Sequence, residues 1–121
     1  MRDLTHDTPK PMPGAEPTPL VIKPRAYEHH PERIVHVIPH QFGKDEVEVY
    51  LPDGTWLGTV ARYTGSIDTK IKGTRLRREG KRRTLWSYRT AHGSVYSMHG
   101  QTSRADCIRS LLDSHARRSR R

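Results

Sequence analysis

Residues 70–83 hold the densest run of charged side chains in the chain. These fourteen residues contain eight Lys or Arg and one acidic residue, and the whole chain of 121 residues has a formal net charge of +9. A cationic run of this kind usually meets a polyanion, of which a DNA or RNA backbone is the commonest. We therefore expect phosphate contacts from Lys70, Lys72, Arg75, Arg77, Arg78, Lys81, Arg82 and Arg83.

The excess of positive charge belongs to one part of the chain. Residues 1–45 contain six Lys or Arg and six Asp or Glu, whereas residues 46–121 contain sixteen and seven. Solubility alone would not require such an asymmetry. It indicates that the C-terminal part meets an anionic partner, and we expect DNA to be favoured over RNA.

The side chains that carry catalysis or bind metals show no comparable pattern. A single cysteine, Cys107, excludes an intrachain disulfide and a cysteine-rich zinc site. A thiol on the first turn of a helix can have a lowered pKa, but a small residue beside the core is the commoner role. His36 and His40 are four residues apart, and Pro39 breaks the helix that would align them. We expect no enzymatic activity, no metal and no cofactor.

Composition allows one small domain. Only 32 % of the residues are hydrophobic, and seven of the nine prolines fall in residues 1–32. Proline removes amide donors and fixes φ, so we expect a disordered, proline-rich tail there. The domain is placed at residues 33–116 and a basic tail at 117–121. No apolar run reaches the ~18–20 residues that cross a bilayer, so we expect no membrane contact and a cytoplasmic location.

Three strands are expected before the basic run. Residues 34–38 are apolar apart from His36 and are followed by Pro39, which predicts an edge strand that could pair with another protein. Residues 46–51 alternate strictly between polar and apolar side chains, and residues 56–63 form the return strand.

The turn between the second and third strands sets their register. A three-residue turn over residues 52–54 pairs Tyr50 with Trp56 and Val49 with Leu57, whereas a two-residue turn shifts the pairing by one residue. We favour the three-residue turn because Pro52 suits its first position. The register also decides whether Trp56 is in the core or exposed for stacking.

The basic run lies in an insert over residues 64–84. Residues 74–78 and 81–86 can pair across Glu79-Gly80, which predicts a protruding basic β-ribbon. A disordered basic insert is the alternative.

A last hairpin and a helix complete the prediction. Residues 85–90 and 95–99 pair across a three-residue turn, with Trp86 and Tyr88 on one apolar face. Ser103 to Asp106 resembles a capping box, and a helical face follows, formed by Ala105, Ile108, Leu111, Leu112 and His115. The sequence predicts an α+β fold, in which a small antiparallel sheet of three to five strands is packed by one C-terminal helix.

Residues 46–115 resemble the arm-type DNA-binding domain of phage tyrosine integrases. The resemblance rests on Asp53-Gly54 between strands, the segment Trp86-Ser87-Tyr88-Arg89, and the helix start at residues 102–107. It implies a three-stranded sheet, backed by a helix, that meets the major groove, with Arg62 and Arg89 facing the groove. The insert over residues 64–84 is longer than this pattern requires. A double-stranded-RNA-binding domain fits less well, because prolines occupy the place of its first helix.

Two functions are consistent with these features. The first is a small DNA-binding module without catalysis, which docks through the basic ribbon and one sheet face. The second is a phage or mobile-element structural or accessory protein, which acts through protein contacts at the sheet edge or the proline-rich tail.

Overall fold

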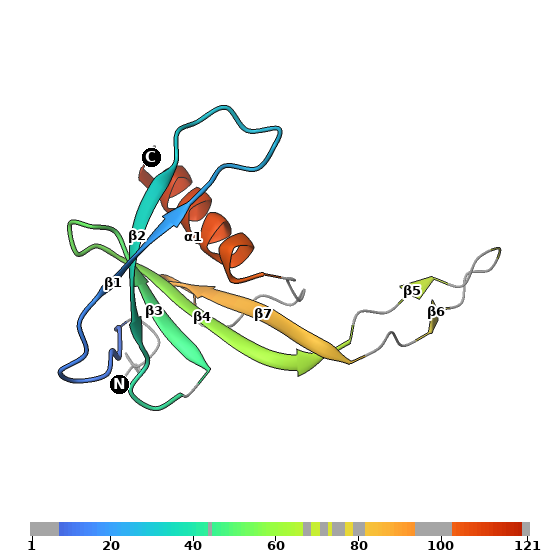
Figure 1. Ribbon diagram of the computed structural model, residues 1–121, viewed down its shortest axis with the longest axis horizontal. Helices are drawn as coiled ribbons and strands as arrows, with labels where there is room; N and C mark the ends of the chain where they lie inside the picture. The colour runs from blue at the N-terminus through green and yellow to red at the C-terminus, as the bar shows by residue number, and fades with distance from the viewer. Residues whose placement is uncertain are drawn as a thin grey trace.

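A five-stranded antiparallel sheet packed against one helix forms the body of the protein. The computed structural model describes residues 8–43, 45–66, 69–70, 73, 77–78, 82–93 and 103–119. The elements are β1 (Thr18–Ile22), β2 (Arg33–Pro39), β3 (Glu46–Tyr50), β4 (Trp56–Gly65), β5 (Thr69–Lys70), β6 (Arg77–Arg78), β7 (Arg83–Thr90) and α1 (Arg104–Ser119). The main sheet has the order β1-β2-β3-β4-β7, and β5 and β6 form a second, two-stranded sheet. Figure 1 shows α1 beside the main sheet, which confirms the predicted α+β fold.

The strand β1 corrects the prediction of a tail without regular structure over residues 1–32. It pairs with β2 in an antiparallel ladder in which Leu20 lies opposite Val35. Ile22, at the end of β1, is 2 % exposed and belongs to the core. Proline is tolerated here because β1 lies at a sheet edge, where one side of the strand makes no ladder hydrogen bonds. Residues 1–7 of the predicted tail lie outside the described part of the chain.

The strand β2 is not at an edge, contrary to the prediction. It lies between β1 and β3, with Val37 paired to Thr18 on one side and to Val49 on the other. Pro39 fits because it is the last residue of the strand. The strand β1 therefore occupies the edge of β2 at which the sequence predicts a contact with another protein.

The hairpin of β3 and β4 combines the two registers that the sequence allowed. Next to the turn, Tyr50 pairs with Trp56, as the three-residue turn predicts. Beyond a β-bulge, Val49 pairs with Gly58, so the predicted pairing of Val49 with Leu57 is wrong. The bulge inserts Leu57 as an extra residue, and Gly58 accommodates it with a φ of +150°.

The strands β4 and β7 form one long hairpin. Their ladder runs from Gly58 opposite Thr90 to Gly65 opposite Arg83. Beyond it, β5 pairs with β6, so residues 77–78 lie opposite 69–70 and not opposite residues 81–86. The predicted ribbon with its turn at Glu79-Gly80 is therefore wrong in its pairing. The midpoint of the observed pairs falls next to Gly73, whose φ is +79°.

The predicted partner of β7 over residues 95–99 lies outside the described residues. Within β7, Trp86 and Tyr88 both pack against the core, as the expected alternation requires. Trp56 is half-buried, and its indole N–H donates to the carbonyl of Gly58 at 3.0 Å.

Helix α1 starts where the capping pattern predicts. The amide of Asp106 donates to Ser103 Oγ at 3.1 Å, which satisfies one of the free N–H groups of the first turn. Ile108, Leu111 and Leu112 are buried on the helical face that faces the sheet, and Ala105 packs beside them. Cys107 is also fully buried, so its role beside the core is confirmed.

The N-terminal segment is attached to both faces of the sheet. On the helix side, Arg109 Nε donates to the carbonyl of Lys23 at 2.9 Å, just after β1. On the opposite face, the amide of Lys10 donates to the Glu48 carboxylate at 2.8 Å, and Thr59 Oγ donates to its other oxygen. Glu48 is only 1 % exposed, so these bonds satisfy a carboxylate removed from water.

Candidate nucleic-acid interface

The part of the β4–β7 hairpin from Gly65 to Arg83, which we name the hairpin arm, carries the predicted cationic residues. Figure 1 shows that β5 and β6 lie beyond the end of β4 and β7 that is far from α1. Lys70, Arg77 and Arg78 occupy strand positions in this arm, and Arg82 and Arg83 are exposed at its base. Lys72, Arg75 and Lys81 lie outside the described residues.

The register of the arm places cations opposite one another. Lys70 pairs with Arg77, and the neighbouring Arg78 pairs with the uncharged Thr69. Like charges directly opposite on paired strands are destabilising. The register therefore brings two formally cationic positions level with each other on the two strands.

The base of the arm is connected to the main sheet. Arg83 continues the β4–β7 ladder through its pairing with Gly65. Arg82 Nη2 donates to the carbonyl of Thr64 at 3.3 Å while the side chain stays exposed. The two arginines therefore project from a defined position where the ribbon leaves the sheet.

Arg62 and Arg89, which the integrase resemblance places in a groove, lie on opposite faces of the sheet. Arg62 pairs with Trp86, which packs against the core on the helix side. Arg89 pairs with Thr59, three positions from Arg62 along β4. Side chains at odd spacing on one strand point to opposite faces. A single sheet face that includes both arginines is therefore excluded.

The surroundings of the two arginines also differ. Arg62 is exposed and makes a short ion pair with Asp45, and its amide donates to the Asp45 carbonyl at 2.8 Å. Arg89 is half-buried, and its Nε has no access to solvent. In the same cross-strand row lie Thr59 and the buried Glu48. Of the two, Arg62 is the more accessible to a ligand.

The structure has an apolar groove on the sheet that the sequence does not predict. Pro17, His36, Ile38 and Tyr50 contribute to a pocket of about 440 Å³ that is bounded by the β3–β4 turn. Val21 and Ile34, each 51 % exposed, pair in the same sheet on β1 and β2. Residues 17 and 21 fall within the predicted proline-rich tail, so no local pattern places them beside β2.

Histidine, cysteine and acidic side chains do not form a metal-binding cluster in the described part of the chain, and Cys107 is buried. No group of three or more His, Cys, Asp or Glu residues that could hold a metal occurs among the described residues. Burial, and secondarily the charge of Asp106, raises the pKa of the Cys107 thiol to about 12. A buried thiol with this pKa is a poor nucleophile. None of the helices in the described ranges is long and apolar enough to span a membrane.

Comparisons with protein-family models, curated proteins and solved structures give no match for this chain. The resemblance to the integrase arm-type domain therefore stays a prediction.

Proposed function

We propose that this protein binds nucleic acid, with duplex DNA preferred, by inserting the hairpin arm between phosphate backbones, and that it carries out no catalysis. The observation that supports this proposal most directly is the pairing of Lys70 with Arg77 in a two-stranded ribbon beyond the main sheet. The major groove of B-DNA, about 12 Å wide, admits a two-stranded β-ribbon.

The preference for DNA over duplex RNA follows from groove shape. The major groove of A-form RNA is deep and narrow, and side chains cannot read it. A ribbon with cations on both strands can approach the phosphates on both sides of the wider DNA groove. Contacts of this kind give affinity and position but little sequence information.

Arg62 and Arg89 have a smaller role in this proposal than the sequence predicted. Since they lie on opposite faces, only one can approach a duplex together with the arm. Arg62 is the better candidate because its guanidinium is exposed beside the β4–β7 hairpin. A phosphate that approaches it would compete with Asp45.

Charge reversal of the arm tests the proposal. Arg82→Glu/Arg83→Glu changes the net charge by −4 at the base of the arm, and Lys23→Glu/Arg117→Glu makes the same change at exposed sites elsewhere. Binding to a fluorescent duplex is measured by anisotropy over a salt series. The unchanged protein should show a slope of log K against log salt near −4 to −5 if about five phosphates are contacted.

We expect the arm variant to lose affinity by at least about tenfold and to show a shallower salt slope, because two phosphate contacts become repulsive. The control variant should retain most of the affinity. Equal losses in the two variants would contradict the proposal, because binding would then depend on net charge and not on the arm.

A second candidate function, a protein-contact module, is favoured by the apolar groove beside Val21 and Ile34. Exposed apolar surface of this kind marks interaction sites. The same salt series separates the two functions. A chain that binds neither duplex nor single-stranded DNA or RNA at low salt supports the second function and not the first.

A further inference from the structure

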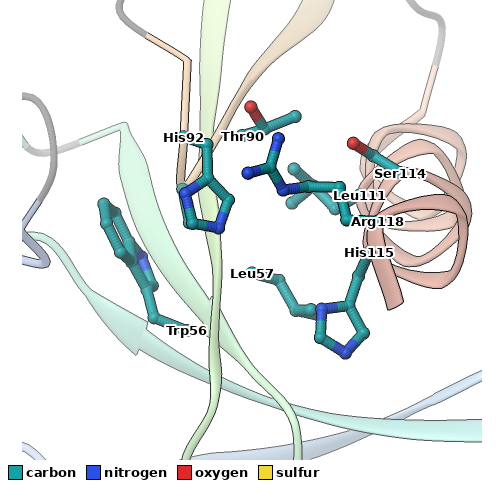
Figure 2. A pocket seen from close by; sticks show the side chains of 9 residues that line it. Trp56, Leu57, Thr90, His92, Leu111, Ser114, His115 and Arg118 are labelled. Carbon is teal, nitrogen blue, oxygen red and sulfur yellow. The ribbon is translucent and has the colours of Figure 1, made fainter. Parts of the chain in front are cut away.

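A small pocket between the C-terminal half of α1 and the end of β7 brings together polar side chains from α1 and from the end of β7, beside an aromatic side chain of β4. Ser114, His115 and Arg118 come from α1, Thr90 and His92 from the end of β7 and the turn after it, and Trp56 from the start of β4. Figure 2 shows the guanidinium of Arg118 extending from the helix toward Thr90 and His92. Trp56 lies on the side of His92 away from the helix in this view.

The helical positions explain why the pocket is polar. Leu111, Ser114, His115 and Arg118 follow one another at spacings of three, one and three residues, so they share one face of α1. Leu111 is 1 % exposed and closes the inner wall of the pocket. On this face the apolar Leu111 is followed by the polar Ser114, His115 and Arg118 as the helix leaves the core.

The side chains that line the pocket suit an anion better than a cation. They supply one guanidinium, two imidazoles and two hydroxyl groups, and none of the lining residues is acidic. The volume of about 20 Å³ suits a single oxygen atom, since a water molecule needs roughly 10–15 Å³ by the same measure. An oxyanion could place one oxygen inside while its remaining oxygens stay at the mouth.

Two neighbouring features decide which donors matter most. Asp53, whose carboxylate accepts the amide of Thr55 at 2.9 Å, also interacts electrostatically with His115. A carboxylate near His115 competes with an added anion, which leaves Arg118 and His92 as the main donors. The C-terminal end of α1 carries partial negative charge, so binding depends on these side chains and not on the helix dipole.

We propose that this pocket binds a phosphate-type oxyanion through Arg118 and His92, with the hydroxyl groups of Thr90 and Ser114 as further donors. The proposal does not rest on the nucleic-acid function, because the site lies near the C-terminal end of α1, away from the hairpin arm. A guanidinium matches the geometry of phosphate oxygens and forms charge-assisted hydrogen bonds with them.

The test uses inorganic phosphate as the probe on the full chain, with sodium chloride added to keep the ionic strength constant. Binding is followed by NMR through the ring signals of His92 and His115 and the indole signal of Trp56. We expect saturable shifts of these signals. Arg118→Gln should weaken phosphate binding by about tenfold or more, because it removes a charge-assisted hydrogen bond.

Arg117→Gln is the matched control. It makes the same change of charge one residue away: both arginines are exposed, but only Arg118 lines the pocket. It should leave phosphate affinity within about twofold of the original protein, because an exposed charge that does not contact the anion contributes little. His92→Gln provides a second lining variant and should also weaken binding.

Three results would overturn the proposal. These are the absence of saturable shifts, shifts confined to signals outside the pocket, and equal losses in Arg118→Gln and Arg117→Gln. Each would show that this pocket is not a specific phosphate site.

Duplex binding of Arg118→Gln identifies the source of the phosphate. A salt slope that becomes shallower by about 1 assigns the pocket to a DNA backbone phosphate. An unchanged slope, together with lost phosphate binding, assigns it to a free phosphate or a small phosphorylated molecule. Failure of the nucleic-acid proposal would appear as no duplex binding by any variant, and the phosphate titration would still stand.

Discussion

At the scale of single residues, Gly58 shows how closely the sheet and the helix are packed. A Cβ at this position would lie 2.1 Å from the carbonyl oxygen of Arg89 and 2.9 Å from Leu111 Cδ2. The first contact is with backbone of the neighbouring strand, so a rotamer change cannot relieve it. Glycine at the bulge therefore permits both the register of β3 with β4 and the approach of α1.

Gly58→Ala should destabilise the protein by about 3 kcal/mol or more, because both the positive φ and the contact with β7 oppose a side chain. Urea unfolding monitored by tryptophan fluorescence measures the loss. Gly54→Ala is the control: its φ is +94°, but nothing lies within 4 Å of the added Cβ. That substitution should cost about 1 kcal/mol. Similar losses for the two would show that the close packing at Gly58 has no energetic weight.

Glu48 illustrates a different residue-scale effect. In sequence it is one of the polar positions of an alternating strand, which usually face solvent. In the structure the segment near Lys10 crosses that face and buries it. Burial of Tyr50, with a smaller effect from the charge of Glu48, raises the pKa of that phenol to about 12.

At the scale of elements, helix α1 is the best-specified part of the chain. Its cap, its apolar face and the cations in its last turn agree with one another, and a local pattern of this kind needs no distant partner to be recognised. Its register against the sheet is set by Ile108, Leu111 and Leu112.

Ser103→Ala should destabilise the protein by about 1 kcal/mol, because the amide of Asp106 loses its side-chain acceptor. Ser110→Ala, inside the same helix, is the matched control. It should be neutral or slightly stabilising, since alanine has the higher helix propensity. Thermal unfolding followed by circular dichroism measures both. A neutral Ser103→Ala would contradict the importance of the cap.

For the hairpin arm, the sequence predicted a cationic two-stranded ribbon but not which residues of its two strands pair. The cations and the extended segments are present, but the two halves pair across residues 71–76 and not across Glu79-Gly80. The reason is continuity: the β4–β7 ladder already aligns Gly65 with Arg83, and the arm follows nearly the same register. Local turn chemistry at Glu79-Gly80 does not offset that long-range pairing.

At the scale of the whole molecule, the N-terminal segment is part of the fold. Ile22 joins the same core cluster as Val35, Ile108 and Leu112, and β1 contacts α1. Arg25 lies 3.7 Å from the Asp106 carboxylate, and Arg33 lies 3.6 Å from that of Asp113. These contacts connect the first strands of the chain to its last helix.

Ile22→Ala should therefore cost about 2–5 kcal/mol, as expected for a buried isoleucine. Val21→Ala, at the adjacent and 51 % exposed position, should cost less than about 1 kcal/mol. Urea midpoints of the two variants give the comparison. A neutral Ile22→Ala would mean that residues 18–22 do not contribute to the core and behave as the tail that the prolines suggest.

The sequence alone determined the features that depend on neighbours in the chain. The alternation of residues 46–51, the capped helix and the concentration of cations at residues 70–83 are all local, and the described structure agrees with the first two. The fold class follows from them, because a short antiparallel sheet must bury one face, and among the described residues α1 supplies an apolar helical face that can cover it.

The tertiary structure decided what depends on residues far apart. Membership of β1 in the sheet, burial of Glu48, the bulge at Gly58 and the separation of Arg62 from Arg89 all follow from long-range pairing, in which a shift of one residue reverses every side chain. The same holds for the phosphate pocket. Trp56, His92 and Arg118 have no common pattern in the sequence, and they meet only because β4, β7 and α1 pack together.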